Sequence, residues 1–261
     1  MLIGYPDRWR DYSKLVIRRD DLFGNVARAE AFEYRLGLAK LGRPVDRGRF
    51  DLQVIDVGGW SNPQLVNIGF PAAALQPPLF DLKADPAVNY GAIGAVVGHE
   101  FSHLFDDQGR KIDAHGKLRN WWKREEAATF DRKAAGLALQ YDAYAPLPGT
   151  HVDGARTLGE NLADLSGLEV ALDAYHLALD GRDAPVIDGF SGDQRFFLGF
   201  AQMQRTVQTD ERLRRQIMSD LHVPATLRTE EVRNLDAWYR SFGVAPSDRW
   251  FLGPEDRERL W

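Results

Sequence analysis

The segment Val96–His103 reads Val-Val-Gly-His-Glu-Phe-Ser-His, and its His-Glu-x-x-His pattern constrains the fold more than any other feature of the chain. On a helix, His99 and His103 lie one turn apart on a single face, so both imidazoles can reach one zinc ion. Glu100 lies one residue round from that face, where its carboxylate can act as a general base on a water molecule. The pattern predicts a helix that carries a zinc site. The alternative is a surface helix with two hydrogen-bonded histidines.

The composition limits which ligands and partners the chain can use. It has 261 residues and no cysteine, which excludes disulfides and thiolate zinc ligands. A hydrophobic content of 44% and a charged content of 27% are typical of a soluble globular protein. The net charge of −5, with no basic run interleaved with aromatic residues, argues against a nucleic-acid partner. Any metal must therefore be held by histidines and carboxylates, a ligand set that suits a catalytic zinc.

Neither a membrane segment nor an export signal is apparent in the sequence. The longest apolar stretch near the motif, residues 92–97, is too short to cross a bilayer. The first nine residues lack the positive and then apolar layout of a signal peptide. We therefore expect no membrane-spanning segment, and a cytoplasmic location if the chain is complete.

Hydrophobic spacing predicts a mostly helical α+β fold with a small sheet, in one domain spanning residues 1–261. Short strands and turns are expected across residues 50–70, around paired glycines. On the helix expected over residues 20–41, the side chains predicted to face inward are Leu22, Val26, Ala29, Phe32, Leu36 and Ala39. The other helices are expected over residues 89–107 (the motif helix), 121–141, 158–179, 194–210 and 234–242.

Two histidines do not complete a zinc site, and the best candidate for a third ligand is Glu160. Glu160 and Asp164 are spaced i, i+4 and so face the same way from a helix. If that helix packs against the motif helix, Glu160 can bind the metal and Asp164 can accept a hydrogen bond from a ligand imidazole. Asp106, one turn after His103, is the candidate partner of the other ring. The alternative is that these carboxylates are ordinary solvated charges.

Beyond these residues, the chain resembles the C-terminal catalytic part of the neprilysin-like family of zinc metallopeptidases. The resemblance covers nearly the whole sequence, and its most specific element is the zinc motif together with a distal Glu-Asn-x-Ala-Asp. The matching stretches are Gly4-Tyr-Pro-Asp-Arg-Trp9, Asp21-Leu-Phe-Gly-Asn25, Phe70-Pro-Ala-Ala-Ala-Leu-Gln-Pro-Pro78, Val88-Asn-Tyr-Gly91, Phe105-Asp-Asp-Gln-Gly109, Arg119-Asn-Trp-Trp122, Gly159-Glu-Asn-Leu-Ala-Asp164 and Gly192-Asp-Gln-Arg-Phe-Phe197.

The resemblance implies a thermolysin-like zincin fold of the gluzincin type, with one zinc ion per chain held by His99, His103 and Glu160. It implies Glu100 as the general base of peptide-bond hydrolysis. Asp106 and Asp164 would then orient the two imidazoles.

Two further residues gain roles from the resemblance alone. His222 matches the histidine that stabilises the oxyanion of the tetrahedral intermediate in the family. Arg228 matches the arginine that binds a backbone carbonyl of the substrate. Taken by itself, His222 would be interpreted as an ordinary loop residue.

The sequence departs from the family where a peptide would bind. Relatives carry Asn-Ala-aromatic-Tyr on the edge strand that aligns the substrate, whereas this chain has Gly58, Gly59, Trp60 and Ser61 at those positions. Gly59 can still offer its carbonyl and Trp60 an aromatic wall, but the asparagine side chain is missing. Gln204 replaces a tryptophan that lines a pocket for the substrate in relatives. These differences predict altered or weaker peptide binding with the zinc chemistry intact.

Relatives are far longer, with an N-terminal portion that completes the catalytic domain and adds a helical cap over the site. The chain is therefore expected to be a fragment, a minimal protein with an open site, or a subunit whose partner chain or second copy replaces the cap. If it is a fragment, the resemblance implies a periplasmic or extracellular location. Besides a zinc peptidase, the alternatives are a weakly active zinc-binding interaction module that needs a partner, and a specialised amide or peptide hydrolase of a biosynthetic pathway.

Overall fold

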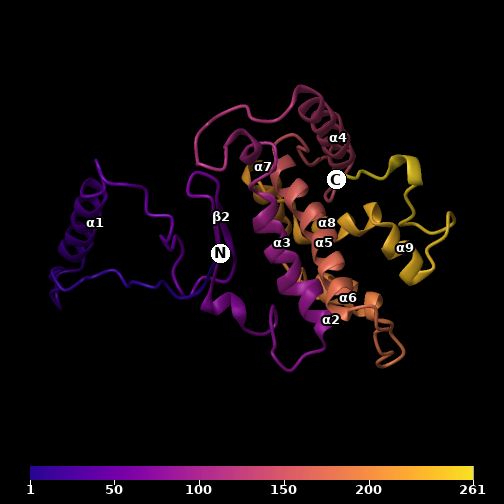
Figure 1. The fold of residues 1–261 in the computed structure, drawn as a ribbon, viewed down its shortest axis with the longest axis horizontal. Helices are drawn as coiled ribbons and strands as arrows, with labels where there is room; N and C mark the ends of the chain where they lie inside the picture. The colour runs from indigo at the N-terminus through magenta and orange to yellow at the C-terminus, as the bar shows by residue number, and fades with distance from the viewer. Residues whose placement is uncertain (261) are drawn as a thin grey trace.

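The computed structural model describes residues 1–260 and confirms the expected α+β class, with helices dominating and one small sheet (Figure 1). The strands are β1 (Leu2–Gly4), β2 (Trp60–Asn62) and β3 (Asn67–Pro71). The helices are α1 (Leu22–Leu38), α2 (Pro86–Asn89), α3 (Ala95–Ser102), α4 (Arg124–Asp142), α5 (Leu158–Leu179), α6 (Gly192–Met203), α7 (Asp210–Ser219), α8 (Ala225–Arg228) and α9 (Asp236–Phe242).

The sheet has the order β1-β3-β2. β3 lies at its centre with all five residues buried, and it pairs in parallel with β1 and antiparallel with β2. β2 therefore forms a free edge of the sheet among the described residues. The strands expected within residues 50–70 are present at β2 and β3, whereas residues 50–59 form turns. β1 was not predicted, because three residues are too few to show a hydrophobic pattern.

α3 and α5 lie side by side at the centre of the molecule (Figure 1). α2 continues through one turn of π-helix (Tyr90–Gly94) into α3, and α3 packs most extensively against α5. α6 packs against α2 and the π-turn, and α4 covers α5. Large side chains from these helices fill the core, including Phe130, Leu137, Leu165, Leu168 and Phe196.

Three expected helix boundaries were wrong. The motif helix ends at Ser102 rather than near residue 107, because the chain turns back on the helix end. A Cβ atom on Gly109 would lie only 1.9 Å from the carbonyl oxygen of His103. α4 begins at Arg124, after the two tryptophans. The helix expected over residues 194–210 stops at Met203. A separate α7 then begins after Thr209, whose side chain accepts a hydrogen bond from the backbone N–H of Arg212.

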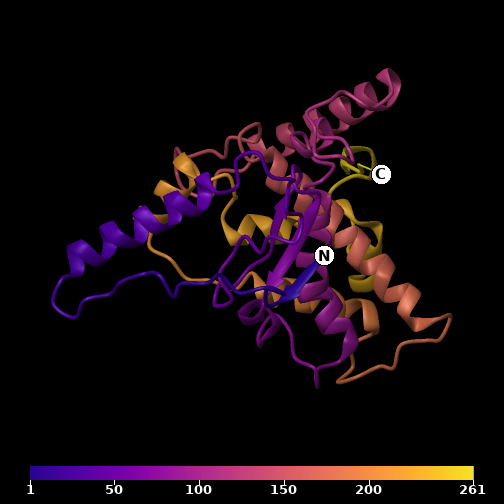
Figure 2. The same cartoon turned by 60° about the vertical axis from the view of Figure 1, so that its left-hand side comes forward.

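α1 projects away from the rest of the chain in both views (Figures 1 and 2). The helix was expected to bury one apolar face, but only Phe32 is buried, against the ring of Tyr12. Leu22 is 80% exposed and Val26 is 50% exposed, because no described element covers that face. The expectation of an inward face was therefore wrong for most of this helix.

None of the helices described within residues 1–260 has both the length and the apolar character needed to span a bilayer.

Candidate metal centre

α3 carries the two histidines of the motif. His99 lies inside the helix and is 6% exposed, while His103 directly follows the last helical residue. Their rings meet edge to face with centroids 4.6 Å apart, and their Nε2 atoms are 3.0 Å apart. The one-turn spacing therefore aims both Nε2 atoms at the same place, as the pattern predicts.

Two facing glycines bring α5 against α3 at this point. A Cβ atom on Gly98 would lie 2.4 Å from the carbonyl oxygen of Gly167. A Cβ atom on Gly167 would lie 2.4 Å from the backbone nitrogen of His99. Backbones can approach this closely only without side chains at the contact. Glu160 and Asp164 lie two turns and one turn before Gly167, so the same contact carries them to the histidines.

Glu160 completes a convergence of three potential ligand atoms. Its Oε2 atom lies 3.3 Å from Nε2 of His99 and 3.5 Å from Nε2 of His103. This oxygen is buried, yet no hydrogen bond satisfies it. Ligand atoms at roughly 2.0–2.1 Å from a tetrahedral zinc ion lie about 3.3–3.4 Å from one another. The spacing of the three atoms therefore fits a zinc ion.

The outer nitrogen of each ring faces a carboxylate. Nδ1 of His99 lies 2.7 Å from Oδ1 of Asp164, and Nδ1 of His103 lies 2.7 Å from Oδ2 of Asp106. A neutral imidazole that donates its Nδ1 proton presents a lone pair at Nε2. Two such lone pairs 3.0 Å apart beside a carboxylate oxygen repel one another unless a cation lies between them.

The electrostatics of the site also favour positive charge. Burial lowers the pKa of His99, but the carboxylate of Asp164 outweighs it and raises this pKa to about 9. For His103, burial is outweighed by Asp106 and Glu160, and the pKa rises to about 10. Burial would raise the pKa of the Glu160 carboxyl, yet the surrounding imidazoles hold it well below its usual range. A divalent cation among these groups would supply positive charge that balances the negative charge of the carboxylates.

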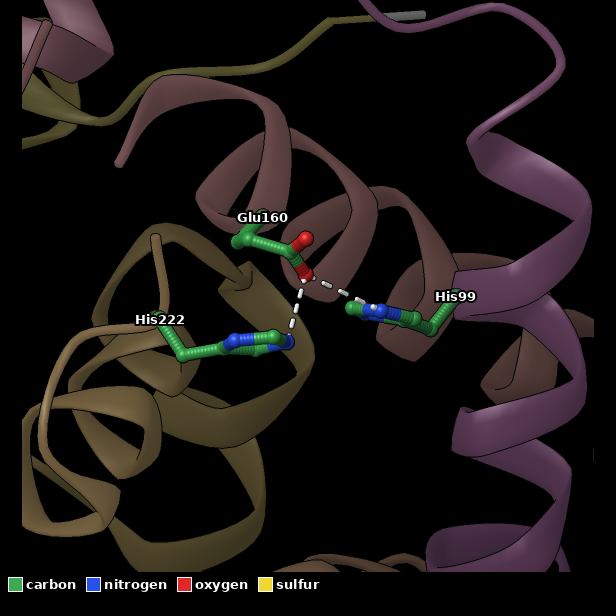
Figure 3. Close-up of side chains that lie close together, drawn as sticks. All are labelled: His99, Glu160 and His222. Carbon is green, nitrogen blue, oxygen red and sulfur yellow. Dashed lines mark ion pairs between the residues drawn. The ribbon is translucent and has the colours of Figure 1, made fainter. Parts of the chain in front are cut away.

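His222 reaches the same carboxylate from the loop between α7 and α8 (Figure 3). Its Nε2 atom lies 3.0 Å from Oε2 of Glu160, and its Nδ1 atom lies 3.1 Å from Oδ1 of Asp220. The Glu160 carboxylate raises the pKa of His222. His99, Glu160 and His222 each offer one ligand atom, and these three atoms lie within 4.8 Å of one another.

Glu100, the proposed base, lies between the histidine face of α3 and the sheet. It is 8% exposed, and burial raises the pKa of its carboxyl although His99 and His103 oppose the rise. The backbone of Gly59, just before β2, is its close neighbour. A Cβ atom on Gly59 would lie 2.5 Å from Cγ of Glu100 and 2.8 Å from its Oε1.

The other residues expected to contact substrate lie in different surroundings. Gly58 has open space where a side chain would project. Trp60 is only 8% exposed, because its ring covers Gly69 and meets Phe50 at a centroid distance of 4.6 Å. Gln204 follows α6 and is partly buried; within residues 1–260 no hydrogen bond joins it to the converging residues.

Arg228, at the end of α8, is held by Asp164. Its Nε and Nη2 atoms donate to the two carboxylate oxygens at 2.7 and 2.6 Å. Burial would raise the pKa of Asp164, but Arg228 and His99 lower it. Asp164 therefore fixes both a ring of the candidate metal centre and a guanidinium next to it.

Sequence reasoning missed three residues that shape this site. Gly98 and Gly167 set the helix contact, and Asp220 holds the ring of His222. A glycine inside a long helical pattern is a signal of close packing, and Gly167 within residues 158–179 fits that description. Asp220 lies two residues before His222, a separation at which the side chains of a loop can meet. Neither signal shows which other part of the chain the residue meets.

Known proteins resemble the chain in sequence over most of its length. The model of peptidase family M13 matches residues 59–258. An endothelin-converting enzyme homolog of Locusta migratoria is 36% identical over 240 residues, which is 87% of this chain and 32% of that protein. Neprilysin-3 of Drosophila melanogaster is 32% identical over 272 residues, covering 100% of this chain and 34% of that protein. The chain thus spans about a third of the length of the curated relatives it matches.

A solved structure agrees closely in fold. The zinc metalloprotease Zmp1 of Mycobacterium tuberculosis, in complex with an inhibitor, is 49% identical and superposes with a TM-score of 0.96. The match covers 100% of this chain and 41% of that one. The expected resemblance and the expected use of zinc in this group of proteins are confirmed at the level of the family.

Proposed function

The chain belongs to peptidase family M13, and on that premise we propose that it holds one zinc ion and hydrolyses peptide bonds. The proposed ligands are His99, His103 and Glu160. One observation carries the proposal: the buried Oε2 atom of Glu160 lies within 3.5 Å of both Nε2 atoms and has no hydrogen bond. Three potential ligand atoms that face one another in this way suit a cation at their centre, which supports the proposed site.

The proposed chemistry assigns the proton transfers to Glu100. A bound zinc ion acts as a Lewis acid on the scissile carbonyl and lowers the pKa of nearby water. Glu100 takes a proton from the attacking water and later delivers it to the leaving amine. Its burial suits this role, because a raised pKa brings the carboxyl closer to the pH at which it must both accept and release a proton.

Four residues around the ligands have positioning or binding roles in this proposal. Asp106 and Asp164 hold the imidazoles in the tautomer that offers Nε2 to the metal. His222 donates a hydrogen bond to the developing oxyanion. Arg228 binds a substrate carbonyl through Nη1, which makes no hydrogen bond to any residue of the described chain, 1–260.

The free edge at β2 is the proposed position of the peptide backbone. An extended peptide can add to a sheet edge through main-chain hydrogen bonds, and this edge begins beside Gly59, whose backbone lies against Glu100. Gly58 offers no side chain, and the Trp60 ring is buried. Peptide binding at this edge therefore depends on backbone contacts, which supports the expectation of weaker binding.

We also propose that residues 1–261 form one catalytic domain, with α1 as its outlying part. The exposed α1 favours a second candidate function, a zinc-binding subunit that is fully active only with a partner. Phe23 on this helix is 87% exposed and Leu22 is 80% exposed. Most of the stability of a helix in a protein comes from packing of its apolar face, so a partner that covered α1 would stabilise it.

Metal analysis and peptide digestion of the purified chain test the proposal. Wild type should bind one zinc per chain and cleave members of a mixed peptide library. His103→Ala should lose both properties, while the control His151→Ala, at an exposed position, should keep them. Zinc binding without cleavage would favour the partner-dependent subunit. A wild-type chain that binds no zinc would refute the proposed site.

A further inference from the structure

Glu231 is a fully buried acid that the proposed chemistry does not use. It lies in the 3-10 helix Thr229–Asn234, directly after α8 and three residues after Arg228. Its Oε1 atom is hydrogen-bonded to the hydroxyl group of Tyr141, whereas its Oε2 atom is buried and has no hydrogen bond to the described residues, 1–260. An unpaired buried oxygen costs far less free energy on a neutral carboxylic acid than on a carboxylate. The contacts of Glu231 therefore favour its protonated form.

The charges around Glu231 favour the same form. Asp164 of α5 already accepts from two nitrogens of Arg228, at 2.7 and 2.6 Å, so one carboxylate balances one guanidinium. Burial raises the pKa of Glu231 well above its usual value, and the charges of Asp164 and Glu169 add to the rise. The hydroxyl of Tyr141 and the guanidinium of Arg228 oppose the rise without outweighing it. An ionised Glu231 would place a second buried carboxylate near the same guanidinium.

Tyr141 connects Glu231 to the other side of Arg228. This tyrosine lies at the C-terminal end of α4 and is 1% exposed. Its hydroxyl oxygen contacts Glu231 and also lies 3.5 Å from the carbonyl oxygen of Leu227, the residue before Arg228. A hydroxyl group has one proton, so it can donate to only one of the two. When Glu231 is protonated and donates to the hydroxyl, the hydroxyl proton is left for the carbonyl of Leu227.

Resting on the proposed role of Arg228, we propose that Glu231 and Tyr141 are positioning residues for its guanidinium. Glu231, as a neutral acid, donates to Tyr141, and Tyr141 donates to Leu227. These two hydrogen bonds tie the chain on both sides of Arg228 to α4, while Asp164 holds the guanidinium from α5. Arg228 is then fixed with its Nη1 atom left for a substrate carbonyl.

Tyr141→Phe removes the hydroxyl and keeps the buried ring. With one fluorogenic peptide that wild type cleaves, KM should rise about 3- to 10-fold while kcat changes by less than about 2-fold. This split is expected because Arg228 binds a carbonyl of the substrate before and during the reaction alike. Circular dichroism checks that the variant is folded.

Tyr144→Phe is the matched control. Its hydroxyl accepts from Nη1 of Arg233 at 3.0 Å, and its ring packs edge to face against that of Tyr141 at a centroid distance of 5.2 Å. The control therefore removes a hydroxyl from the neighbouring ring without touching Glu231. It should keep the KM of wild type.

Glu231→Gln distinguishes a neutral acid from a carboxylate. The amide is neutral and can donate to Tyr141, so this variant should keep the KM of wild type. The infrared difference spectrum at neutral pH, wild type minus Glu231→Gln, should contain the carbonyl band of one protonated carboxylic acid. Glu230→Gln is the control, because Glu230 pairs with Arg233 at 2.7 Å, and its difference spectrum should contain no such band.

Two results overturn the inference and leave the proposed function standing. One is an unchanged KM in folded Tyr141→Phe, and the other is a carboxylate band in place of the acid band for Glu231. If wild type cleaves no peptide, the proposed function and this positioning role fail together, whereas the infrared spectra still report the proton on Glu231.

Discussion

Gly98 of α3 and Gly167 of α5 touch backbone to backbone, and this contact places Glu160 opposite the two histidines of the motif. The carbonyl oxygen of Gly167 occupies the space that a side chain at residue 98 would need, at 2.4 Å. Replacing Gly167 by alanine would in turn force its methyl group against the backbone nitrogen of His99, also at 2.4 Å. Backbone atoms on both sides leave no flexible group to move aside.

Gly167→Ala should therefore push α5 away from α3 and weaken both folding and metal binding. We expect a loss of about 1–3 kcal/mol in the free energy of unfolding, the usual range for overpacking, together with weaker zinc binding. Urea denaturation and zinc competition measure the two effects. Gly37→Ala on α1 is the control, because its Cβ would meet no atom within 4 Å. That change should stabilise the helix by roughly 0.5–1 kcal/mol. Equal behaviour of the two variants would contradict the contact.

Glu100→Gln separates metal binding from proton transfer. The amide keeps the size of the side chain but cannot accept the proton of the attacking water. Zinc content should stay at one per chain while peptide hydrolysis falls by at least about 100-fold. Glu30→Gln, at an exposed position of α1, should leave both unchanged. Hydrolysis at the wild-type rate in the Glu100 variant would remove this residue from the mechanism.

Gly59→Ala tests the close approach of the β2 edge to the general base. The new methyl group would lie 2.5 Å from Cγ of Glu100 and 2.8 Å from the ring of Phe70, so the carboxylate must shift. A misplacement of this size should lower kcat by roughly 10- to 100-fold while zinc stays bound. Gly58→Ala is the matched control, with no atom within 4 Å of its Cβ. Similar kcat values for the two variants would count against the approach of Gly59.

Asp106→Asn weakens the support of His103. The carboxylate lies 2.7 Å from Nδ1 of His103 and also accepts the backbone N–H groups of Gln108 and Gly109 at 2.9 and 2.7 Å. An amide has one acceptor oxygen and cannot serve the ring and the turn together. Zinc affinity should fall by about 10- to 100-fold. Asp107→Asn, whose carboxylate contacts the Gln108 side chain, should change the affinity far less.

Local spacing was sufficient to predict which side chains on the helices lie together at the candidate metal centre. His99 and His103 follow helical periodicity, as do Glu160 and Asp164, and the predicted helix over residues 158–179 matches α5 at both ends. Such features depend only on residues within one or two turns. The expectation that α5 packs on the motif helix came from chemistry, since a third ligand was needed, and not from any pattern in the helix surfaces.

Features that depend on distant residues could not be predicted from spacing. Trp60 was expected to line the substrate site, but it is buried because Gly69 on β3 leaves room for its ring. His222 lies 62 positions after Glu160 in the sequence, and nothing near it in the chain indicates that they meet. The apolar face of α1 was expected to be buried but is mostly exposed. A hydrophobic pattern indicates that a helix has an apolar face, but it does not show whether another element covers that face.

Glu169 on α5 makes the stability of the folded chain decrease as the pH rises. Burial raises the pKa of its carboxyl from 4.5 to about 7, opposed by Arg259 and Lys133 and assisted by Asp173. The folded state therefore favours the protonated form. Its contribution to stability is fully present below pH 4.5 and is lost as the pH rises through about 7.

Glu169→Gln should consequently be more stable than wild type at pH 8, because glutamine stays neutral. The expected gain is about 1–2 kcal/mol after allowance for solvent screening, and it should vanish near pH 4.5. Urea denaturation of both proteins across this range measures the difference. Glu125→Gln, at an exposed position of α4, should show no comparable change with pH. A gain for Glu169→Gln that is the same at every pH would show that the charge of Glu169 is not its cause.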